Sequence, residues 1–269
     1  MRAFGMNVNI CNTNDEYVAR MKELGFSAAH TASLTAPAEQ ARIADLFARH
    51  GLFYEFLHSP FSHMNDIWLD CEGGEVMLAE LMESVDRCAE CGIPVDVIHL
   101  SSGIKAPSVS DLGRRRYHTL VEHAARRNVK LAFENLRKLY NVAWAMEEFR
   151  DCPHVGFCWD SGHEVCYTPT IEFMTLYGDR LLCTHIHDNR GIPCQDDHMI
   201  PFDGVANFER LAHHIRTSGY EGPITMELSN AKHAPYRDLS PFEFMERAAS
   251  AARRIVAMIE EDARDAVAF

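Results

Sequence analysis

Histidine and carboxylate side chains recur along the chain at the ends of short apolar runs of β type. Glu134 ends the run LAFE, Asp160 ends GFCWD, and His185 lies in LLCTHIHD. Glu134 and Asp160 are 26 residues apart and Asp160 and His185 are 25 apart, which is close to one strand–helix repeat. This spacing predicts side chains on successive strands at similar height. Converging carboxylates repel one another unless a cation neutralises them, so we expect a metal site here.

Three further runs carry the same residue types at the same end. His58 ends FYEFLH, His99 lies in DVIHLSSG and Glu227 lies in ITMELS. One such residue alone is most often a helix cap or a hydrogen-bonded core residue. Six such residues at the same end of six runs are harder to explain as caps. Glu134 and Glu227 also follow apolar runs, where an unpaired carboxylate would be costly. We therefore expect one cluster of ligands.

Two loops carry a second set of candidate ligands. His163 follows Asp160 by three residues in DSGH, and the segment 191–204 carries Asp196 and His198. A long loop without secondary structure in a compact domain is usually functional. A donor set of His, Asp and Glu without Cys suits Zn²⁺, Mn²⁺, Co²⁺ or Fe²⁺.

Eight β-type runs alternate with eight helical patterns, and this arrangement must position the candidate ligands. We expect strands at 3–9, 27–30, 53–58, 95–100, 130–134, 155–160, 181–187 and 224–228, and helices at 15–24, 37–50, 75–91, 111–127, 144–150, 171–177, 208–218 and 241–261. Such alternation predicts a parallel sheet, and eight strands are the number that closes it into a barrel. No GxGxxG or GxxxxGK[ST] motif indicates a nucleotide-binding sheet. We expect one α/β domain over 1–269.

The composition is that of an acidic globular protein. The 269 residues are 47% hydrophobic, and 26 Lys and Arg stand against 39 Asp and Glu, a formal charge of −13. This balance makes nucleic acid an unlikely partner, because surfaces that follow phosphates need clustered Lys and Arg. No apolar run approaches the ~20 residues of a membrane span, and the amino terminus has no secretory apolar region. We expect a cytoplasmic protein that does not associate with membranes.

The motifs FENL, CWDSGH, THIHDN, DDHMIPFDG and TMELS resemble those of the xylose-isomerase-like TIM barrel superfamily, which includes sugar phosphate isomerases and epimerases and, more distantly, endonuclease IV. The resemblance spans essentially the whole chain and implies a single-domain (β/α)8 TIM barrel. It implies one divalent ion, Mn²⁺, Zn²⁺, Co²⁺ or Mg²⁺, on Glu134, Asp160, His185 and Glu227. His185 and His187 face the same side of one strand, and the family's His-x-[Lys/Asp/Asn]-Asp pattern favours His185 as the ligand.

For function, the resemblance implies a metal-dependent isomerase or epimerase that acts on a small sugar or sugar derivative. Glu134 and Glu227 would exchange protons next to a carbonyl through an enediolate, and His163 and Arg190 would contact the substrate. A metal-assisted lyase begins with the same proton abstraction, and the sequence does not separate it from an isomerase. Oligomers are common among such barrels, so a homo-oligomer is compatible with the fold.

The main alternative is an endonuclease IV-like zinc phosphodiesterase that acts on abasic DNA. Up to three ions would then bind, because the resemblance implies further ligands: His58 and His99 for one ion, and His163, Asp196 and His198 for another. The charge of −13 and the lack of an evident basic or aromatic segment that could follow a DNA strand argue against this alternative. A non-catalytic carbohydrate-binding barrel is a third hypothesis.

Overall fold

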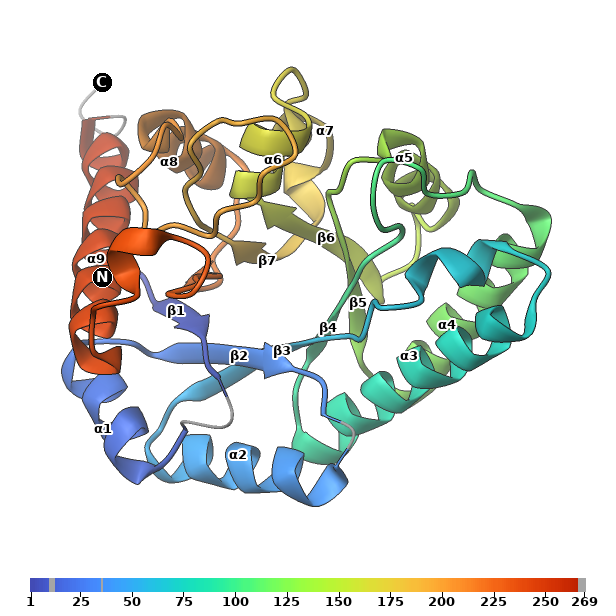
Figure 1. Cartoon of the computed structure of the whole chain (residues 1–269), viewed down its shortest axis with the longest axis horizontal. Coiled ribbons are helices and arrows are strands. Elements are labelled where there is room, and N and C mark those ends of the chain that lie inside the picture. The colour runs from blue at the N-terminus through green and yellow to red at the C-terminus, as the bar shows by residue number, and fades with distance from the viewer. Residues whose placement is uncertain (10–12, 35, 266–269) are drawn as a thin grey trace.

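In the computed structural model, eight parallel strands form one sheet that curls into a nearly closed barrel with helices outside it (Figure 1). The strand order is β7-β6-β5-β4-β3-β2-β1-β8. The last gap, between β7 and β8, is bridged where the Ile186 amide donates to the Thr225 carbonyl oxygen at 2.9 Å. The structure describes residues 1–9, 13–34 and 36–265, with side chains as far as Glu261. The predicted fold class, a single α/β barrel, is confirmed; residues 266–269 of the predicted domain lie outside the described residues.

The strands end close to the predicted positions. Their bounds are β1 Phe4–Asn7, β2 Ala28–Ala32, β3 Phe53–His58, β4 Val95–Ile98, β5 Lys130–Glu134, β6 Val155–Asp160, β7 Leu181–His185 and β8 Ile224–Met226. The strands β1, β4, β7 and β8 each end two residues earlier than predicted, and β2 ends two residues later. Apolar residues continue past the hydrogen-bonded ladder there, since Leu100 and Leu228 are buried beyond β4 and β8.

The described residues form the helices α1 Asp15–Glu23, α2 Pro37–Arg49, α3 Glu72–Cys91, α4 Asp111–Arg127, α5 Leu139–Glu148, α6 Ser161–Tyr167, α7 Phe173–Tyr177, α8 Phe208–Thr217 and α9 Pro241–Asp265. The short 3₁₀ helices are η2 Met64–Trp68, η3 Gly178–Arg180 and η4 Ala234–Tyr236. No helix in this part of the chain combines the length and apolar character that a membrane crossing requires. The prediction for α5, 144–150, began too late, and α6 was not predicted.

Helix α6 follows β6 without an intervening loop, because Asp160 is both the last strand residue and the helix N-cap. Its Oδ1 accepts a hydrogen bond from the His163 amide at 2.6 Å. Seven residues are too few to show an apolar repeat of helical period. Asp160 therefore caps this short helix and also supplies a carboxylate that we expect in the metal site.

The hydrophobic core has two parts. The larger part fills the space between the sheet and the helices, and a smaller one lies on the inward faces of the strands and is made of Phe56, Val95, Val97, Ala132, Cys158 and Cys183. The cysteines among the described residues are all free. The packed interior leaves the carboxyl ends of the strands as the place where polar residues gather.

One carboxyl, Glu55 on β3, lies inside the barrel with 3% of its surface exposed. Its oxygens accept hydrogen bonds from the hydroxyls of Thr225 and Tyr220. Burial raises the pKa of Glu55 from its ordinary 4.5 to about 8, against the smaller opposing effects of Thr225, His185 and Tyr220. The folded protein therefore keeps this carboxyl protonated at neutral pH.

We expect Glu55→Gln to stabilise the protein at alkaline pH. A carboxyl whose folded-state pKa lies above its unfolded value binds an extra proton in the folded state, so stability falls as pH rises from 4.5 to about 8. Glutamine removes that loss, and the free energy of unfolding at pH 8 should rise by roughly 4 kcal/mol. Urea unfolding between pH 4.5 and 8 measures the effect. The control is Glu83→Gln at an exposed position of α3; a wild-type pH slope in Glu55→Gln would contradict the prediction.

Candidate metal centre and substrate pocket

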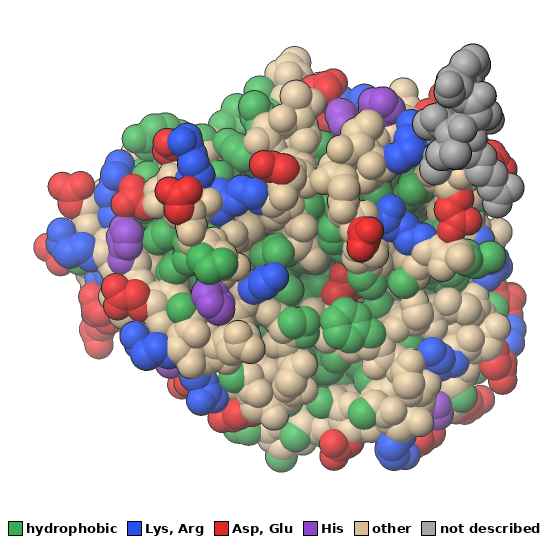
Figure 2. Space-filling view, turned by 180° about the vertical axis from the view of Figure 1, so that it is seen from behind, with side chains coloured by type: hydrophobic (Ala, Val, Ile, Leu, Met, Phe, Trp, Pro, Cys, Tyr) green, Lys and Arg blue, Asp and Glu red, His purple; other side chains and the backbone are tan. Residues whose placement is uncertain are grey.

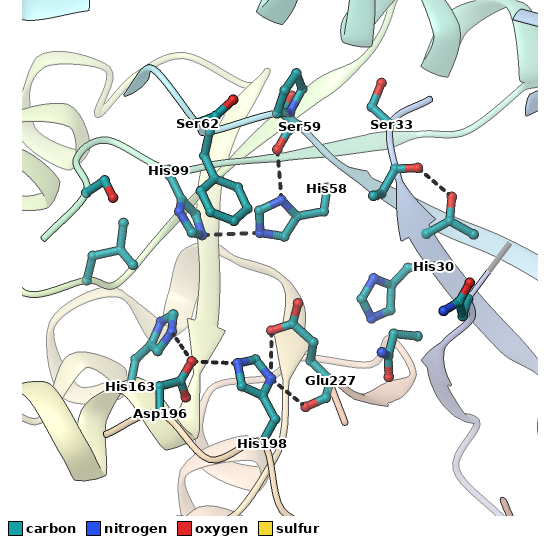
Figure 3. A pocket seen from close by; sticks show the side chains of 18 of the residues that line it. His30, Ser33, His58, Ser59, Ser62, His99, His163, Asp196, His198 and Glu227 are labelled. Atoms are coloured by element: carbon teal, nitrogen blue, oxygen red, sulfur yellow. Dashed lines mark hydrogen bonds and ion pairs between the residues drawn. The ribbon is translucent and has the colours of Figure 1, made fainter. Parts of the chain in front are cut away.

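A cavity of about 1070 Å³ opens at the carboxyl ends of the strands (Figure 3). Parallel strands all end at the same edge of a sheet, so the strand-terminal residues of this barrel converge there. The cavity is lined by six of the predicted site residues, His58, His99, His163, Asp196, His198 and Glu227. The predicted residues Glu134, Asp160 and His185 are buried next to them.

Four donors gather around one point in the first group, which consists of Glu134, Asp160, His185 and Glu227. The donor atoms lie within 4.8 Å of one another. His185 Nδ1 lies 3.2 Å from Glu134 Oε1, 3.9 Å from Asp160 Oδ2 and 3.7 Å from Glu227 Oε2. The structure thus brings together the four residues that the resemblance implied for one ion. We call this set the four-residue group.

Two groups of three donors that contain only predicted residues flank the four-residue group, and a further group joins His187 to His198 and Glu227. The first contains His58, His99 and Glu134, and the second contains His163, Asp196 and His198. His99 Nε2 lies 2.8 Å from Glu134 Oε2, so Glu134 belongs both to the first of these groups and to the four-residue group. We call the two sets the His58 group and the Asp196 group. All nine residues predicted as ligands or possible ligands therefore fall in three adjacent groups.

Backbone carbonyls fix the orientation of three of these histidines. Nδ1 of His58 donates to the Ser59 carbonyl at 2.9 Å, and Nδ1 of His198 donates to the Glu227 carbonyl at 3.0 Å. Nδ1 of His163 lies 3.1 Å from the Asn135 carbonyl. A carbonyl oxygen only accepts, so Nδ1 carries the proton and Nε2 presents a lone pair to the cluster. Histidine ligands of metals are commonly held in this way.

Two buried donor atoms in the cluster, His185 Nε2 and Asp196 Oδ1, have no hydrogen-bond partner among the described residues. His58 Nε2 also lies only 3.2 Å from His99 Nε2. Lone pairs that face carboxylates and one another at such distances repel in the absence of a cation. These residues therefore fit divalent metal, and nitrogen and oxygen donors of this kind suit Zn²⁺, Mn²⁺, Co²⁺ or Fe²⁺.

The electrostatics of the cluster keep its carboxylates ionised. Burial opposes charge on the His185 ring, but the Glu227 and Glu134 carboxylates outweigh burial and raise the pKa of His185 to about 10. Burial also opposes charge on Glu227 and Asp196, yet the surrounding histidines hold the pKa of both carboxyls well below the usual range. The carboxylates therefore depend on positive charge close by, which either protonated histidines or metal ions supply.

His185 and His187 both approach Asp160, but only His185 is in the four-residue group. His187 Nε2 lies 3.0 Å from Asp160 Oδ1, and its ring stacks on His198 with centroids 4.3 Å apart. His187 forms a donor group with His198 and Glu227, whereas His185 faces Glu134 as well as Glu227. The choice of His185 as ligand stays a prediction that this geometry favours.

Gly162 makes room for the His187 ring. A Cβ atom at position 162 would lie 1.9 Å from His187 Cε1, so we expect Gly162→Ala to displace this ring from Asp160. The change should destabilise the protein by about 1–3 kcal/mol and weaken metal binding, measured by thermal unfolding and by metal titration. The matched control is Gly178→Ala, where the new Cβ would lie 3.3 Å from the flexible end of Met174. Equal metal affinities in the two variants would contradict the prediction.

The segment 191–204 is held by a buried carboxylate, Asp188, at its base. Asp188 accepts hydrogen bonds from the amides of Phe202, Gly204 and Ala206 at 2.8–3.0 Å. His198 has a positive φ of 50°, an unfavourable conformation for most residues other than glycine. Strain of this kind persists where the surroundings impose it, and here it turns the His198 ring into the Asp196 group.

The structure does not bring Arg190 into the pocket. Its guanidinium donates to Asp197 and Gln195 at 2.7–3.1 Å, and it is not among the residues that line the cavity. Its predicted contact with substrate therefore has no support in this arrangement. The ion pair with Asp197 across seven residues was not visible in the sequence, because the turn of the loop determines it.

Four residues of the pocket wall, His30, Arg137, Tyr167 and Lys232, were not assigned to the site from the sequence. His30 ended a predicted strand, and the rule applied to the other strand ends would have included it. Figure 3 shows it beside Glu227. Arg137 and Tyr167 lie in the loop after β5 and in the unpredicted helix α6, where no periodic pattern indicated their orientation.

The pocket wall is rich in hydroxyl groups. Ser33, Ser59, Ser62, Ser101 and Ser102 line the cavity together with Thr31, and three of the serines are labelled in Figure 3. Phe61 adds an apolar ring that lies 4.4 Å from the His99 ring, centroid to centroid. Hydroxyl groups and an aromatic ring around a cavity suit a ligand with several hydroxyl groups of its own.

A model of the xylose isomerase-like TIM barrel family matches residues 18–258. The chain is 33% identical over 160 residues to uncharacterized protein y4fM of Sinorhizobium fredii (strain NBRC 101917 / NGR234). The matched region covers 57% of this chain and 49% of that protein, so the chain spans about half the length of this curated relative. The resemblance seen in the sequence motifs is confirmed by the family match.

Solved structures with a similar fold include sugar epimerases. A D-tagatose 3-epimerase-like protein superposes with a TM-score of 0.75 at 18% identity, covering 97% of this chain and 99% of that one. The D-psicose 3-epimerase of Clostridium cellulolyticum H10, solved with D-tagatose, gives a TM-score of 0.76 at 12% identity, covering 96% and 99%. At these identities the likeness establishes the fold.

Proposed function

The chain belongs to the xylose isomerase-like TIM barrel family, and we propose that it is a divalent-metal-dependent sugar isomerase or epimerase. The observation that carries the proposal is the pair Glu134 and Glu227, two carboxylates in one donor group beside a hydroxyl-lined cavity. Structural neighbours named as sugar epimerases support it. A lyase that begins with the same proton abstraction falls within the proposal.

We propose that the four-residue group holds the ion on which the reaction depends. A divalent ion supplies positive charge that acidifies the carbon next to a carbonyl. Of the two carboxylates, Glu227 lines the cavity with 21% of its side chain exposed, whereas Glu134 is fully buried. Glu227 would therefore take the proton from carbon, leaving an enediolate on the sugar. Glu134 would be the partner that returns a proton, with His163 positioned to contact the sugar.

The test is solvent exchange on a panel of ketoses. Protein loaded with Mn²⁺ or Zn²⁺ is incubated with ketopentoses and ketohexoses in D₂O, and NMR locates any deuterium on the carbon skeleton. We expect deuterium on the carbon next to the carbonyl of at least one ketose, together with its epimer or isomer. A ketose that binds without acquiring deuterium would indicate a carbohydrate-binding barrel instead.

A second candidate function is an endonuclease IV-like zinc phosphodiesterase. The His58 group and the Asp196 group support it, since one-ion proton transfer does not need them. Against it, the formal charge is −13, and the face in Figure 2 intermixes Lys and Arg with Asp and Glu. The test is incubation of the zinc-loaded protein with duplex DNA that contains one abasic site. Intact DNA at stoichiometric protein would reject this candidate.

A further inference from the structure

Arg137, in the loop after β5, lines the cavity but has no partner for its N–H groups. Among the described residues, no hydrogen bond and no ion pair involves its guanidinium, which lies over the Tyr167 ring. The guanidinium carbon lies 3.4 Å from the centroid of that ring. Stacking of this kind uses the flat face of the guanidinium and leaves its edges, with five N–H donors, free for another group.

The stack connects Arg137 to the metal centre. Tyr167 and His163 lie four residues apart on α6, on the same face of the helix, and their rings stack with centroids 4.8 Å apart. His163 Nε2 in turn lies 3.6 Å from Asp196 Oδ2. The Tyr167 ring therefore lies between the unpaired guanidinium and His163 of the Asp196 group, and Arg137 lines the cavity that would receive the substrate.

The loop that carries Arg137 is fixed to the next strand. Asn135 Nδ2 donates to the Asp160 carbonyl at 2.8 Å, and the Asp160 amide donates back to Asn135 Oδ1 at 2.8 Å. Leu136 is buried with 6% of its surface exposed. Arg137 thus follows two anchored residues, and its position is not that of a free surface side chain.

The other cations near the site are paired. Lys232 lines the same cavity, but its ammonium lies 3.2 Å from Asp196 Oδ2. Arg190 is held by Asp197 at 2.7 Å. Among the described residues that line the cavity, Arg137 is therefore the one Lys or Arg without an acidic partner. A half-buried guanidinium in this state is suited to an anion supplied by the ligand.

We propose that Arg137 binds an anionic group of the substrate, a phosphate or a carboxylate carried by a ketose. Two oxygens of that group would accept hydrogen bonds from N–H groups on the edge of the guanidinium. That the ligand is a ketose rests on the proposed function, whereas its anionic group is inferred from the geometry of Arg137. The serine-rich wall would hydrogen-bond to the hydroxyl groups of the sugar, and Arg137 would bind its charged end. Substrate selection would thus favour a sugar phosphate or a sugar acid over a neutral sugar.

The test compares dissociation constants of the metal-loaded protein for D-fructose, D-fructose 6-phosphate and 5-keto-D-gluconate, and for D-ribulose and D-ribulose 5-phosphate, by calorimetry. We expect at least one anionic ketose to bind about tenfold or more tightly than its neutral counterpart. Tighter binding of the ketose phosphates would identify the anion as phosphate, and tighter binding of 5-keto-D-gluconate would identify it as carboxylate. In Arg137→Gln the dissociation constants of the neutral and the anionic ketose should differ by no more than about twofold. In Arg137→Lys the difference should lie between those of the wild type and Arg137→Gln.

The matched control is Lys138→Gln, which removes the same charge one residue away at a position outside the cavity wall; its affinity ratio should equal that of the wild type. The proposal is overturned if no anionic ketose binds more tightly than its neutral counterpart. It is also overturned if the preference survives in Arg137→Gln, since the anion would then bind elsewhere. If a neutral ketose acquires deuterium but no anionic ketose binds more tightly, only this inference is overturned. If the anionic ketose binds more tightly through Arg137 but no ketose acquires deuterium, only the proposed function is overturned.

Discussion

Replacing Glu227 with glutamine is expected to reduce deuterium incorporation into a ketose substrate by about 10²–10⁴-fold, the usual contribution of a general base. Glutamine has nearly the shape of glutamate and cannot accept a proton at neutral pH. Glu227 is the carboxylate of the four-residue group that lines the cavity. NMR measures the exchange rate at saturating Mn²⁺, so that weaker metal binding does not limit the rate.

The matched control for this variant is Glu209→Gln, an exposed position in the first turn of α8. It should exchange at the wild-type rate. The far-UV circular dichroism of both variants should match that of the wild type, because neither side chain belongs to the hydrophobic core. A wild-type rate in Glu227→Gln would remove this carboxylate from proton transfer and leave its role as a ligand only.

The metal content of the protein is expected to depend on Glu134 more than on any single histidine of the flanking groups. The four-residue group and the His58 group both have the residue types of a divalent site, and both contain Glu134. From the one-ion proposal we expect close to one equivalent of Zn²⁺ in the wild type and in His99→Gln, and close to none in Glu134→Gln. Three equivalents in the wild type, two in His99→Gln and one in Glu134→Gln would instead favour the phosphodiesterase candidate. Elemental analysis after saturation and removal of free metal gives these values.

The control for metal counting is His118→Gln. His118 is 47% exposed and pairs with Glu148 on the outside of the barrel, so the variant should retain the wild-type metal content. One equivalent in the wild type, lost in Glu134→Gln and kept in His99→Gln, would show that only the four-residue group binds metal. That result, together with intact abasic DNA, would reject the phosphodiesterase candidate.

Much of the site could be predicted from the sequence because its position depends on local patterns. A strand of β type ends where its apolar run ends, and parallel strands end at one edge of the barrel. His58, Glu134 and Asp160 therefore needed only the strand bounds, which the structure matches for β3, β5 and β6. The alternation of strands and helices likewise predicted the barrel before any contact between them was known.

Residues in loops were harder to place, because their side-chain directions depend on backbone conformation rather than on period. Arg190 was expected to contact substrate, yet the turn of its loop pairs it with Asp197. Arg137 carried no expectation, and it stacks on Tyr167 in the cavity wall. His198 lies close to the other predicted ligands, but its left-handed backbone, which turns the ring inward, has no signature in the sequence.

The sequence by itself determined that nine His, Asp and Glu residues belong to strand ends and two loops of one barrel, and hence that an acidic cluster requires neutralising charge. Only the tertiary structure decided which of these residues lie together, that Glu227 reaches the cavity while Glu134 is buried, and that Arg137 has no acidic partner among the described residues that line the cavity. The physical reason is one of range. Strand and helix periods are set by neighbouring residues, whereas convergence of donors and pairing of charges are set by closure of the barrel between residues far apart in the chain.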